Sequence, residues 1–261
     1  MLIKVIDAHT HVNMMDPAQR SAVMQRALAD GIGVINVGAD ELSSRDAVAL
    51  TQLYKEGVWA VVGYHPHEAM KDLDMELLET LARDVRVMGI GECGLDYFKL
   101  DKENEGEIKE KQKVLFESQI TLAHKLGKPL VIHCREAFTD TIMLLEKHRN
   151  LLLPEAGILH FFTGTMENAR ALLNLGFSFT FGGLITFNRS FDEIIAHIPN
   201  ERILVETDAP WVAPKSHRGE QNEPAYIPEI VESLASIKNV SREMMEKILS
   251  ENTKRVFNLV S

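Results

Sequence analysis

The feature that most constrains the fold of this chain is a regular alternation of short apolar runs with segments of helical periodicity. Eight runs rich in β-forming residues recur along the 261 residues, and each is followed by apolar residues at helical spacing. The runs cover residues 3–7, 33–37, 58–63, 86–91, 129–133, 156–160, 177–182 and 203–207. Helices are expected over 18–30, 43–55, 75–83, 108–126, 138–149, 166–175, 191–197, 227–235 and 241–259. Near-continuous apolar strands separated by helices are typical of a parallel sheet buried on both faces.

Eight strand–helix units in a chain of this length predict an α/β fold, a single-domain (β/α)₈ TIM barrel over residues 1–261. A doubly wound open sheet is the alternative. Such a sheet normally has fewer strands and a glycine-rich phosphate turn after the first one. The first turn here reads Asp7-Ala8-His9-Thr10-His11, which contains no glycine. The barrel is therefore the favoured architecture.

Charge and cysteine content narrow the class of protein. The formal net charge of −10 disfavours a broad grip on duplex DNA, so a nucleic-acid substrate would be held by few local contacts and by cations. No apolar stretch of about 18 residues is present and the start does not resemble a signal peptide, so no membrane association is expected. The two cysteines, Cys93 and Cys134, offer no disulfide framework, which favours a cytoplasmic location. No obligate protein partner is implied.

The expected strand ends carry most of the ten histidines together with several carboxylates. In barrel enzymes the active site is built where the carboxyl ends of the strands meet. The polar residues at these ends are His9 and His11, His65 and His67, Glu92 and Asp96, His133 and Arg135, His160, and Glu206, Thr207 and Asp208. This distribution predicts a metal site at the mouth of the barrel.

The chemistry of the individual residues supports that prediction. His9 and His11 are two residues apart on a strand, so they point to one side and can bind one cation. Glu92 lies in an apolar strand, where a carboxylate is costly to bury unless a cation compensates it, and its two oxygens can bridge two cations. An ion pair with an internal Arg or Lys is the alternative. His133 and His160 are expected ligands on neighbouring strands, although an isolated histidine at such a point is more often a hydrogen-bonded core residue.

The predicted site is that of a hydrolase with two divalent ions. Its ligands are nitrogen and oxygen, without thiolate, so Mg²⁺, Mn²⁺, Co²⁺ or Zn²⁺ would suit it. Such ions lower the pKa of bound water, and two ions together stabilise the attacking and leaving oxygens, as is typical of phosphoesterases. Asp208 is well placed to bind a cation and to orient the water or take its proton.

The ordered set of motifs resembles the TatD family of metal-dependent deoxyribonucleases, within the amidohydrolase-like barrels. The resemblance runs nearly end to end. The matching segments are Asp7-Ala-His9-Thr-His11, Gly63-Tyr-His65-Pro66-His67, Gly91-Glu92-Cys-Gly94-Leu95-Asp96, Gln112 with Phe116 and Gln119, Pro129 through Arg135, His160-Phe-Phe-Thr-Gly164, Glu206-Thr207-Asp208-Ala-Pro210 with Trp211, and Asn222 through Tyr226.

The resemblance implies a division of roles. The first cation would be held by His9, His11, Glu92 and Asp208, and the second by Glu92, His133 and His160. The implied activity is Mg²⁺-stimulated cleavage of DNA phosphodiesters by a metal-activated water, with Asp208 and Glu92 as catalytic residues. The residues implied in substrate contact are His65, Arg135 and Arg218. His65 could instead shape the rim, and each arginine could instead serve as a structural ion-pair partner.

Other features leave the substrate open. Glu220 and Gln221 stand where the family often has basic residues, which weakens the case for tight polynucleotide binding. A hydrolase of another ester or amide, such as a D-aminoacyl-tRNA deacylase, is therefore an alternative. A non-catalytic binding protein would be expected to lack a ligand or Asp208, and none is missing. Trp211 is expected either to stack on a base or to cap the barrel mouth, and both cysteines are expected to be inert thiols turned toward the helices.

Overall fold

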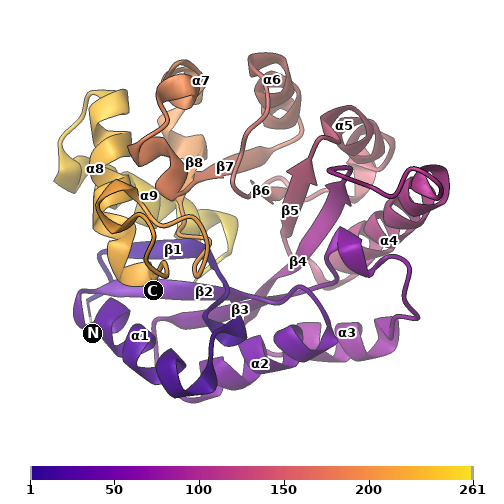
Figure 1. The fold of residues 1–261 in the computed structure, drawn as a ribbon, viewed down its shortest axis with the longest axis horizontal. Coiled ribbons are helices and arrows are strands. Elements are labelled where there is room, and N and C mark those ends of the chain that lie inside the picture. Colours follow the sequence, from indigo (N-terminus) through magenta and orange to yellow (C-terminus); the bar gives the residue numbers. More distant parts are fainter. Residues whose placement is uncertain (1, 260–261) are drawn as a thin grey trace.

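The protein is a nearly closed barrel of eight parallel strands with helices on its outside (Figure 1). The structure is a computed structural model, and it describes residues 2–259. Strands β1 to β8 pair in sequence order within one sheet. The predicted α/β barrel is thereby confirmed. Residues 1, 260 and 261, the ends of the expected domain, lie outside the described part.

The elements follow the expected alternation. The strands are β1 Val5–Thr10, β2 Ile32–Val37, β3 Val58–Val62, β4 Val87–Asp96, β5 Leu130–Arg135, β6 Gly157–Leu159, β7 Phe177–Phe181 and β8 Ile203–Val205. The helices are α1 Pro17–Ala29, α2 Glu41–Gln52, α3 Met75–Ala82, α4 Glu105–Leu126, α5 Phe138–Lys147, α6 Met166–Asn174, α7 Asp192–His197, α8 Ile227–Lys238 and α9 Arg242–Val256. Short 3₁₀ turns occupy many of the connections.

Strand β4 is longer than the predicted run of residues 86–91 and extends to Asp96. Its pairing with β5 shifts between Ile90 and Cys93 and then resumes as far as Asp96. Gly94 permits this continuation. It has φ +128°, and a Cβ there would lie 2.1 Å from the carbonyl oxygen of His133 on β5. Glycine is thus required for the close approach of the two strands.

Two irregular registers aim the key side chains into the barrel. In β1 the pairing shifts between Asp7 and Thr10, and in β4 it shifts at the step that contains Glu92. Side chains alternate along a regular strand, so His9 would otherwise face the helices as Val5 does. An extra residue re-aims the side chain that follows it. The bulges therefore turn His9 and Glu92 toward the interior.

Local capping fixes several helix ends. Asp40 and Ser43 form a reciprocal capping box at the start of α2, and Ser241 accepts a hydrogen bond from the backbone N–H of Met244 at the start of α9. Helix α4 ends at Gly127, whose left-handed φ of +62° suits glycine. These signals explain why the observed helix boundaries lie close to the predicted ones.

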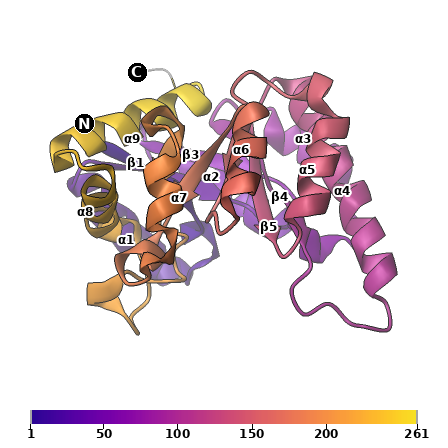
Figure 2. The same cartoon turned by 90° about the horizontal axis from the view of Figure 1, so that it is seen from above.

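The last helix packs on the barrel itself. Helix α9 lies against β1 and β8, and both views show it beside the first strand (Figures 1 and 2). The residues that end it, Val256 and Phe257, with Leu259 just beyond, join the aliphatic interior of the barrel. No helix among residues 2–259 is long and apolar enough to cross a membrane.

The sheet is closed between β1 and β8 at the end where the predicted ligands lie. The backbone N–H of His11 donates to the carbonyl of Ala209 (2.8 Å), and that of Asp208 donates to the carbonyl of His9 (3.0 Å). Asp7 accepts hydrogen bonds from the backbone N–H (3.0 Å) and the hydroxyl (2.5 Å) of Thr207. Burial raises the pKa of Asp7 to about 8. The first residue of the D-x-H-x-H segment therefore ties the barrel together.

Candidate metal centre

The predicted ligands converge on Glu92 at the carboxyl ends of the strands. They come from β1, β4, β5 and the segments that follow β6 and β8. Together they line a pocket of about 370 Å³. Its lining residues are His11, Met14, Ala39, Asp40, His65, His67, Glu68, Glu92, His133, His160, Asp208 and Trp211. His9 lies just beneath and is fully buried.

One oxygen of Glu92 faces the first group of ligands. Its Oε2 lies 3.7 Å from Nε2 of His9 and 3.4 Å from Nε2 of His11. Oδ1 of Asp208 lies 3.8 Å and 3.6 Å from the same two nitrogens, which are themselves 2.9 Å apart. Four potential ligand atoms thus surround one point, which we call the first cation position.

The other oxygen of Glu92 faces a second group. Its Oε1 lies 2.9 Å from Nδ1 of His133, 2.9 Å from Nε2 of His160 and 3.6 Å from Nε2 of His65. We call this point the second cation position. His65 therefore lies among the potential ligands of the second position and does more than shape the rim.

The donor set fits divalent cations. Glu92 is buried, and within residues 2–259 its ion-pair partners are all histidines, so the expected alternative of an internal Arg or Lys partner is not observed. Burial alone would raise the pKa of Glu92, but the surrounding histidines hold it well below its usual range. An ionised carboxylate in such a place requires compensating positive charge. Burial lowers the pKa of His9 well below its usual value and that of His65 to about 3, which leaves both rings neutral, as ligands must be.

Asp208 is held in a conformation that few non-glycine residues adopt. Its φ is +54°, and its backbone N–H donates to the carbonyl of His9. Burial raises the pKa of its carboxyl to about 7. A carboxyl that titrates near neutral pH beside the first cation position has the properties of a proton acceptor.

Two of the histidines are oriented by hydrogen bonds behind the site. Nδ1 of His11 lies 2.9 Å from the carbonyl oxygen of Val37, and Nε2 of His133 lies 3.0 Å from Oδ2 of Asp96. Such partners fix the tautomer and the direction of a metal-binding ring. His133 must therefore offer Nδ1 to the site, whereas His11 offers Nε2.

The paired glutamines of α4 hold two of the loops that carry these residues. Gln112 accepts from the backbone N–H of Asp96 and donates to its carbonyl, both at 2.9 Å. Gln119 does the same for Tyr64, at 2.9 and 2.8 Å, immediately before His65. Each amide satisfies both polar groups of one backbone position, as a neighbouring strand would.

The two expected arginines lie outside the pocket. The guanidinium of Arg135 stacks 3.4 Å above the ring of Phe98, and that of Arg218 lies 4.5 Å above the ring of Phe187. Arg218 also donates to the carbonyl of Ala213 (3.3 Å). No carboxylate in residues 2–259 forms an ion pair with either arginine, so the expected alternative of a structural ion pair is not observed. Both guanidinium groups keep most of their donors free.

Trp211 lies at the mouth of the pocket. The Trp211 side chain is 47% exposed at the pocket mouth, and its ring meets that of His11 edge-on at 5.0 Å. The indole of Trp211 thus forms one wall of the pocket mouth and leaves one of its faces exposed.

The two cysteines lie outside the pocket. Cys93 is buried, and Sγ of Cys134 contacts the hydroxyl of Thr141 on α5 (3.3 Å). Burial raises the pKa of both thiols, that of Cys134 to about 12, as expected for inert cysteines turned toward the helices.

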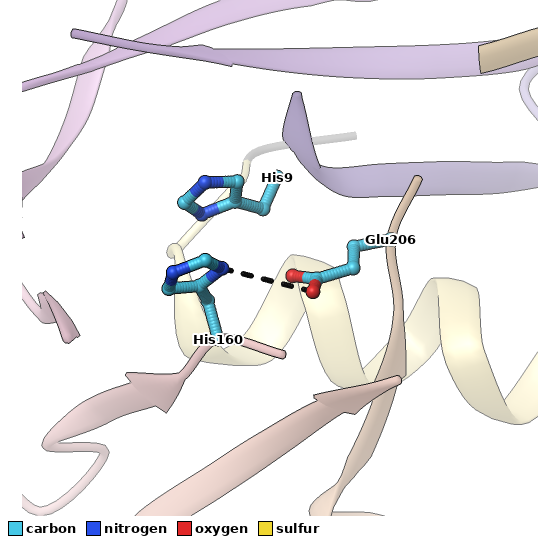
Figure 3. Close-up of side chains that lie close together, drawn as sticks. All are labelled: His9, His160 and Glu206. Atoms are coloured by element: carbon cyan, nitrogen blue, oxygen red, sulfur yellow. Dashed lines mark ion pairs between the residues drawn. The ribbon is translucent and has the colours of Figure 1, made fainter. Parts of the chain in front are cut away.

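Sequence reasoning placed Glu206 at a strand end but gave it no role, and the structure shows it as a fully buried carboxylate beneath the pocket. Its Oε2 accepts from the hydroxyl of Thr180 (2.6 Å), and its Oε1 lies 3.7 Å from Nδ1 of His160 (Figure 3). The ring of His160 stacks on that of His9 at 3.9 Å. The signal available was the one used for Glu92, a carboxylate that directly follows an apolar strand.

Comparison with known proteins places the chain among similar sequences over almost its whole length. The family model described as "TatD related DNase" matches residues 6–258. A Bacillus subtilis protein named "uncharacterized metal-dependent hydrolase YabD" is 34% identical over 261 residues, covering 98% of this chain and 99% of that protein. A protein from Edwardsiella piscicida named "3'-5' ssDNA/RNA exonuclease TatD" is 34% identical, covering 91% and 92%.

A solved structure agrees with the sequence comparisons. The crystal structure of YjjV, a TatD homologue from Escherichia coli, superimposes with a TM-score of 0.88 at 28% identity and covers 100% of both chains. The barrel architecture and the sequence relationship therefore point to the same family.

Proposed function

We propose that this chain, which belongs to the family of TatD-related DNases and is a metal-dependent hydrolase, cleaves phosphodiester bonds of DNA at its barrel mouth. The proposed cofactor is a pair of divalent ions, Mg²⁺, Mn²⁺ or Zn²⁺. The proposed unit is one barrel domain of residues 1–261 in the cytoplasm, which the two unpaired cysteines favour.

The observation that carries this proposal is the position of Glu92 between two groups of ligands. One of its oxygens faces His9 and His11, and the other faces His133 and His160. Two divalent cations, when bound by these residues, would polarise the phosphoryl group, lower the pKa of water and stabilise both the attacking and the leaving oxygen. A carboxylate shared by two positions is what this chemistry requires of the protein.

Asp208 is the proposed proton acceptor. Its carboxylate lies at the first cation position, and its raised pKa of about 7 suits proton transfer near neutral pH. His65 is proposed to contact the phosphate or the leaving oxygen from the second position. Burial keeps its ring neutral, so it can donate one hydrogen bond.

The proposed substrate form is a single strand or a chain end. A pocket of about 370 Å³ has the size of a small-molecule site rather than of a duplex groove. Arg135 and Arg218 are proposed to contact phosphates beyond the pocket, because most of their guanidinium donors are free of partners among residues 2–259 and both groups are held in place by stacking. The related protein from Edwardsiella piscicida is named as an exonuclease of single-stranded DNA and RNA, which is the same kind of substrate.

The proposal is tested by hydrolysis assays on metal-stripped protein resupplied with Mg²⁺, Mn²⁺ or Zn²⁺. The substrates are end-labelled single-stranded DNA, the matching duplex, a small phosphodiester and a D-aminoacyl-tRNA. We expect metal-dependent shortening of the single strand that is lost in Asp208→Asn. The matched control is Asp101→Asn, a change at an exposed residue of the loop between β4 and α4, where the carboxylate accepts from the backbone N–H of Glu103.

Two outcomes would overturn the proposal. Cleavage of the D-aminoacyl ester without cleavage of any phosphodiester would retain the site but assign it to carboxylic esters. Equal DNA cleavage by wild-type protein and Asp208→Asn would trace the activity to a contaminant or to another site.

A further inference from the structure

Three buried polar atoms without a hydrogen-bond partner belong to side chains that lie together beneath the metal pocket. They are Nδ1 of His9, Nδ1 of His160 and Oε1 of Glu206, and none forms a hydrogen bond within residues 2–259. One potential ligand atom from each side chain lies within 4.8 Å of the others. Figure 3 shows the stacked rings of the two histidines with the Glu206 carboxylate beside them.

Such a coincidence calls for a common partner. Buried side-chain polar atoms are nearly always hydrogen-bonded, because an unpaired one loses its interaction with water on burial. The opposite edges of the same groups are engaged. Nε2 of His9 and Nε2 of His160 face Glu92, and Oε2 of Glu206 accepts from Thr180. The three free atoms therefore form a site of their own, on the side away from the pocket.

The protonation of the rings follows from the metal centre. A neutral imidazole has one N–H and one lone pair, so a ring that offers Nε2 to a cation carries its proton on Nδ1. His9 and His160 would then present two N–H donors to Glu206, which is a carboxylate acceptor. The separation of 3.7 Å between Nδ1 of His160 and Oε1 of Glu206 is too long for a direct hydrogen bond.

One water molecule matches this arrangement. Nδ1 of His160 and Oε1 of Glu206, which are 3.7 Å apart, can share one water that lies about 2.8 Å from each, and the ring of His9 stacks on that of His160 at 3.9 Å. A water there accepts from both rings and donates to Oε1. A third cation fits poorly, because it would require both rings to lose their remaining N–H proton.

We propose that Glu206 is a positioning residue that holds His9 and His160 together through one buried water and so couples the two cation positions. The inference rests on the metal-binding part of the proposed function and not on its substrate. His9 belongs to the first position and His160 to the second. Loss of Glu206 should therefore weaken both positions at once.

Asp96 provides a matched control within the same chain. It also supports a potential ligand, through the 3.0 Å contact with Nε2 of His133, but it reaches only the second position. Asp96→Asn should weaken the second position alone. The two carboxylates thus predict different patterns in one measurement.

The test is a titration of the metal-stripped full chain with Co²⁺, followed by calorimetry and by the visible Co²⁺ spectrum, with no nucleic acid present. We expect two equivalents in the wild-type protein. Glu206→Leu should raise both dissociation constants by about 10- to 100-fold, the usual effect of losing a group that orients metal ligands. Glu206→Gln keeps an acceptor oxygen without the charge, so it should raise both by a smaller factor. Asp96→Asn should raise only one.

Several results would overturn the inference. Unchanged dissociation constants in folded Glu206→Leu, or a change at one position only, would remove the coupling. A third equivalent that disappears in this variant would assign the site to a cation instead of a water. If Glu206→Leu does not fold, Glu206→Gln and Thr180→Val decide, since unchanged constants in both would exclude a positioning role. Wild-type protein that binds two equivalents but cleaves no DNA would contradict the proposed function and leave this inference intact.

Discussion

The two cation positions share Glu92 but are built in different ways. The first takes two histidines from one strand end, His9 and His11, and both are almost fully buried. The second takes His133 and His160 from two separate strand ends, with His65 of a third beside them, and the side chains of His65 and His133 are 15% and 18% exposed. The first is fixed mainly by local chain geometry, whereas the second depends on packing across the barrel.

The contacts that orient the histidines also differ between the two positions. His11 is oriented by a backbone carbonyl of β2, which no substitution removes. His133 is oriented by the side chain of Asp96, which is in turn held by Gln112 on α4. We therefore expect the first position to bind its cation more tightly and the second to be the one that exchanges ions and meets the substrate.

The largest expected effect comes from removing what the positions share. Glu92→Ala should abolish binding at both positions and lower DNA cleavage by at least about a thousandfold, because both cations lose a ligand and their charges lose their compensation. Metal analysis of the purified variant checks this. Retention of one full equivalent would mean that one position does not depend on Glu92. Glu107→Ala, an exposed carboxylate at the start of α4, is the control.

Asp208→Asn should lower turnover through its effect at the first position and leave the second position unchanged. The amide still fills the space at the first position but cannot accept a proton, so we expect turnover to fall by about 10²- to 10⁴-fold. The second position should keep its cation affinity. Single-turnover kinetics with saturating metal measures the first effect and calorimetry the second. A normal rate would exclude Asp208 as the proton acceptor.

Lowering the pH should weaken cation binding at both positions. Burial disfavours protonation of His133 and His160, but Glu92 and the other nearby carboxylates outweigh it and raise both pKa values above the usual 6.5, and His11 at the first position is raised in the same way. Below these raised values protons compete with cations for the rings. Metal affinity should thus be full at higher pH and fall by about tenfold per pH unit for each displaced proton as the pH drops. Co²⁺ titrations between pH 8 and pH 6 test this sign, and an affinity independent of pH would contradict it.

The smallest expected effect lies at the rim beside the second position. Arg135 follows His133 on β5, so Arg135→Ala should raise KM for single-stranded DNA by about tenfold or less and reduce the slope of log affinity against log salt by about one. The small phosphodiester should be unaffected. Arg149→Ala, whose guanidinium already pairs with Glu146, is the matched control. Equal effects of the two substitutions would mean that Arg135 contributes only general charge.

The fold was predictable because its signal is repeated eight times along the chain. An apolar strand followed by a helix specifies each unit, so errors were confined to boundaries. Strand β4 is the clearest case. The predicted run stopped at residue 91, but β4 continues to Asp96 because Gly94 allows β5 to come close. A glycine after an apolar run can mark the end of a strand or permit a neighbouring strand to come close. Only the packing of the neighbouring strand decides between these two cases.

The site was predictable in its membership but not in its supports. His9, Glu92 and His133 were identifiable because carboxyl ends of parallel strands must meet. The bulges that aim His9 and Glu92 inward leave no distinct mark in the sequence. Glu206 was given no role because its importance depends on burial and on two histidines more than 40 residues away.

The proposed position of Glu92 between two cations can be tested by anomalous diffraction from crystals soaked in Mn²⁺. We predict two anomalous peaks on opposite sides of the Glu92 carboxylate, one beside His9 and His11 and the other beside His133 and His160. A single peak, or two peaks of which neither contacts Glu92, would contradict the account.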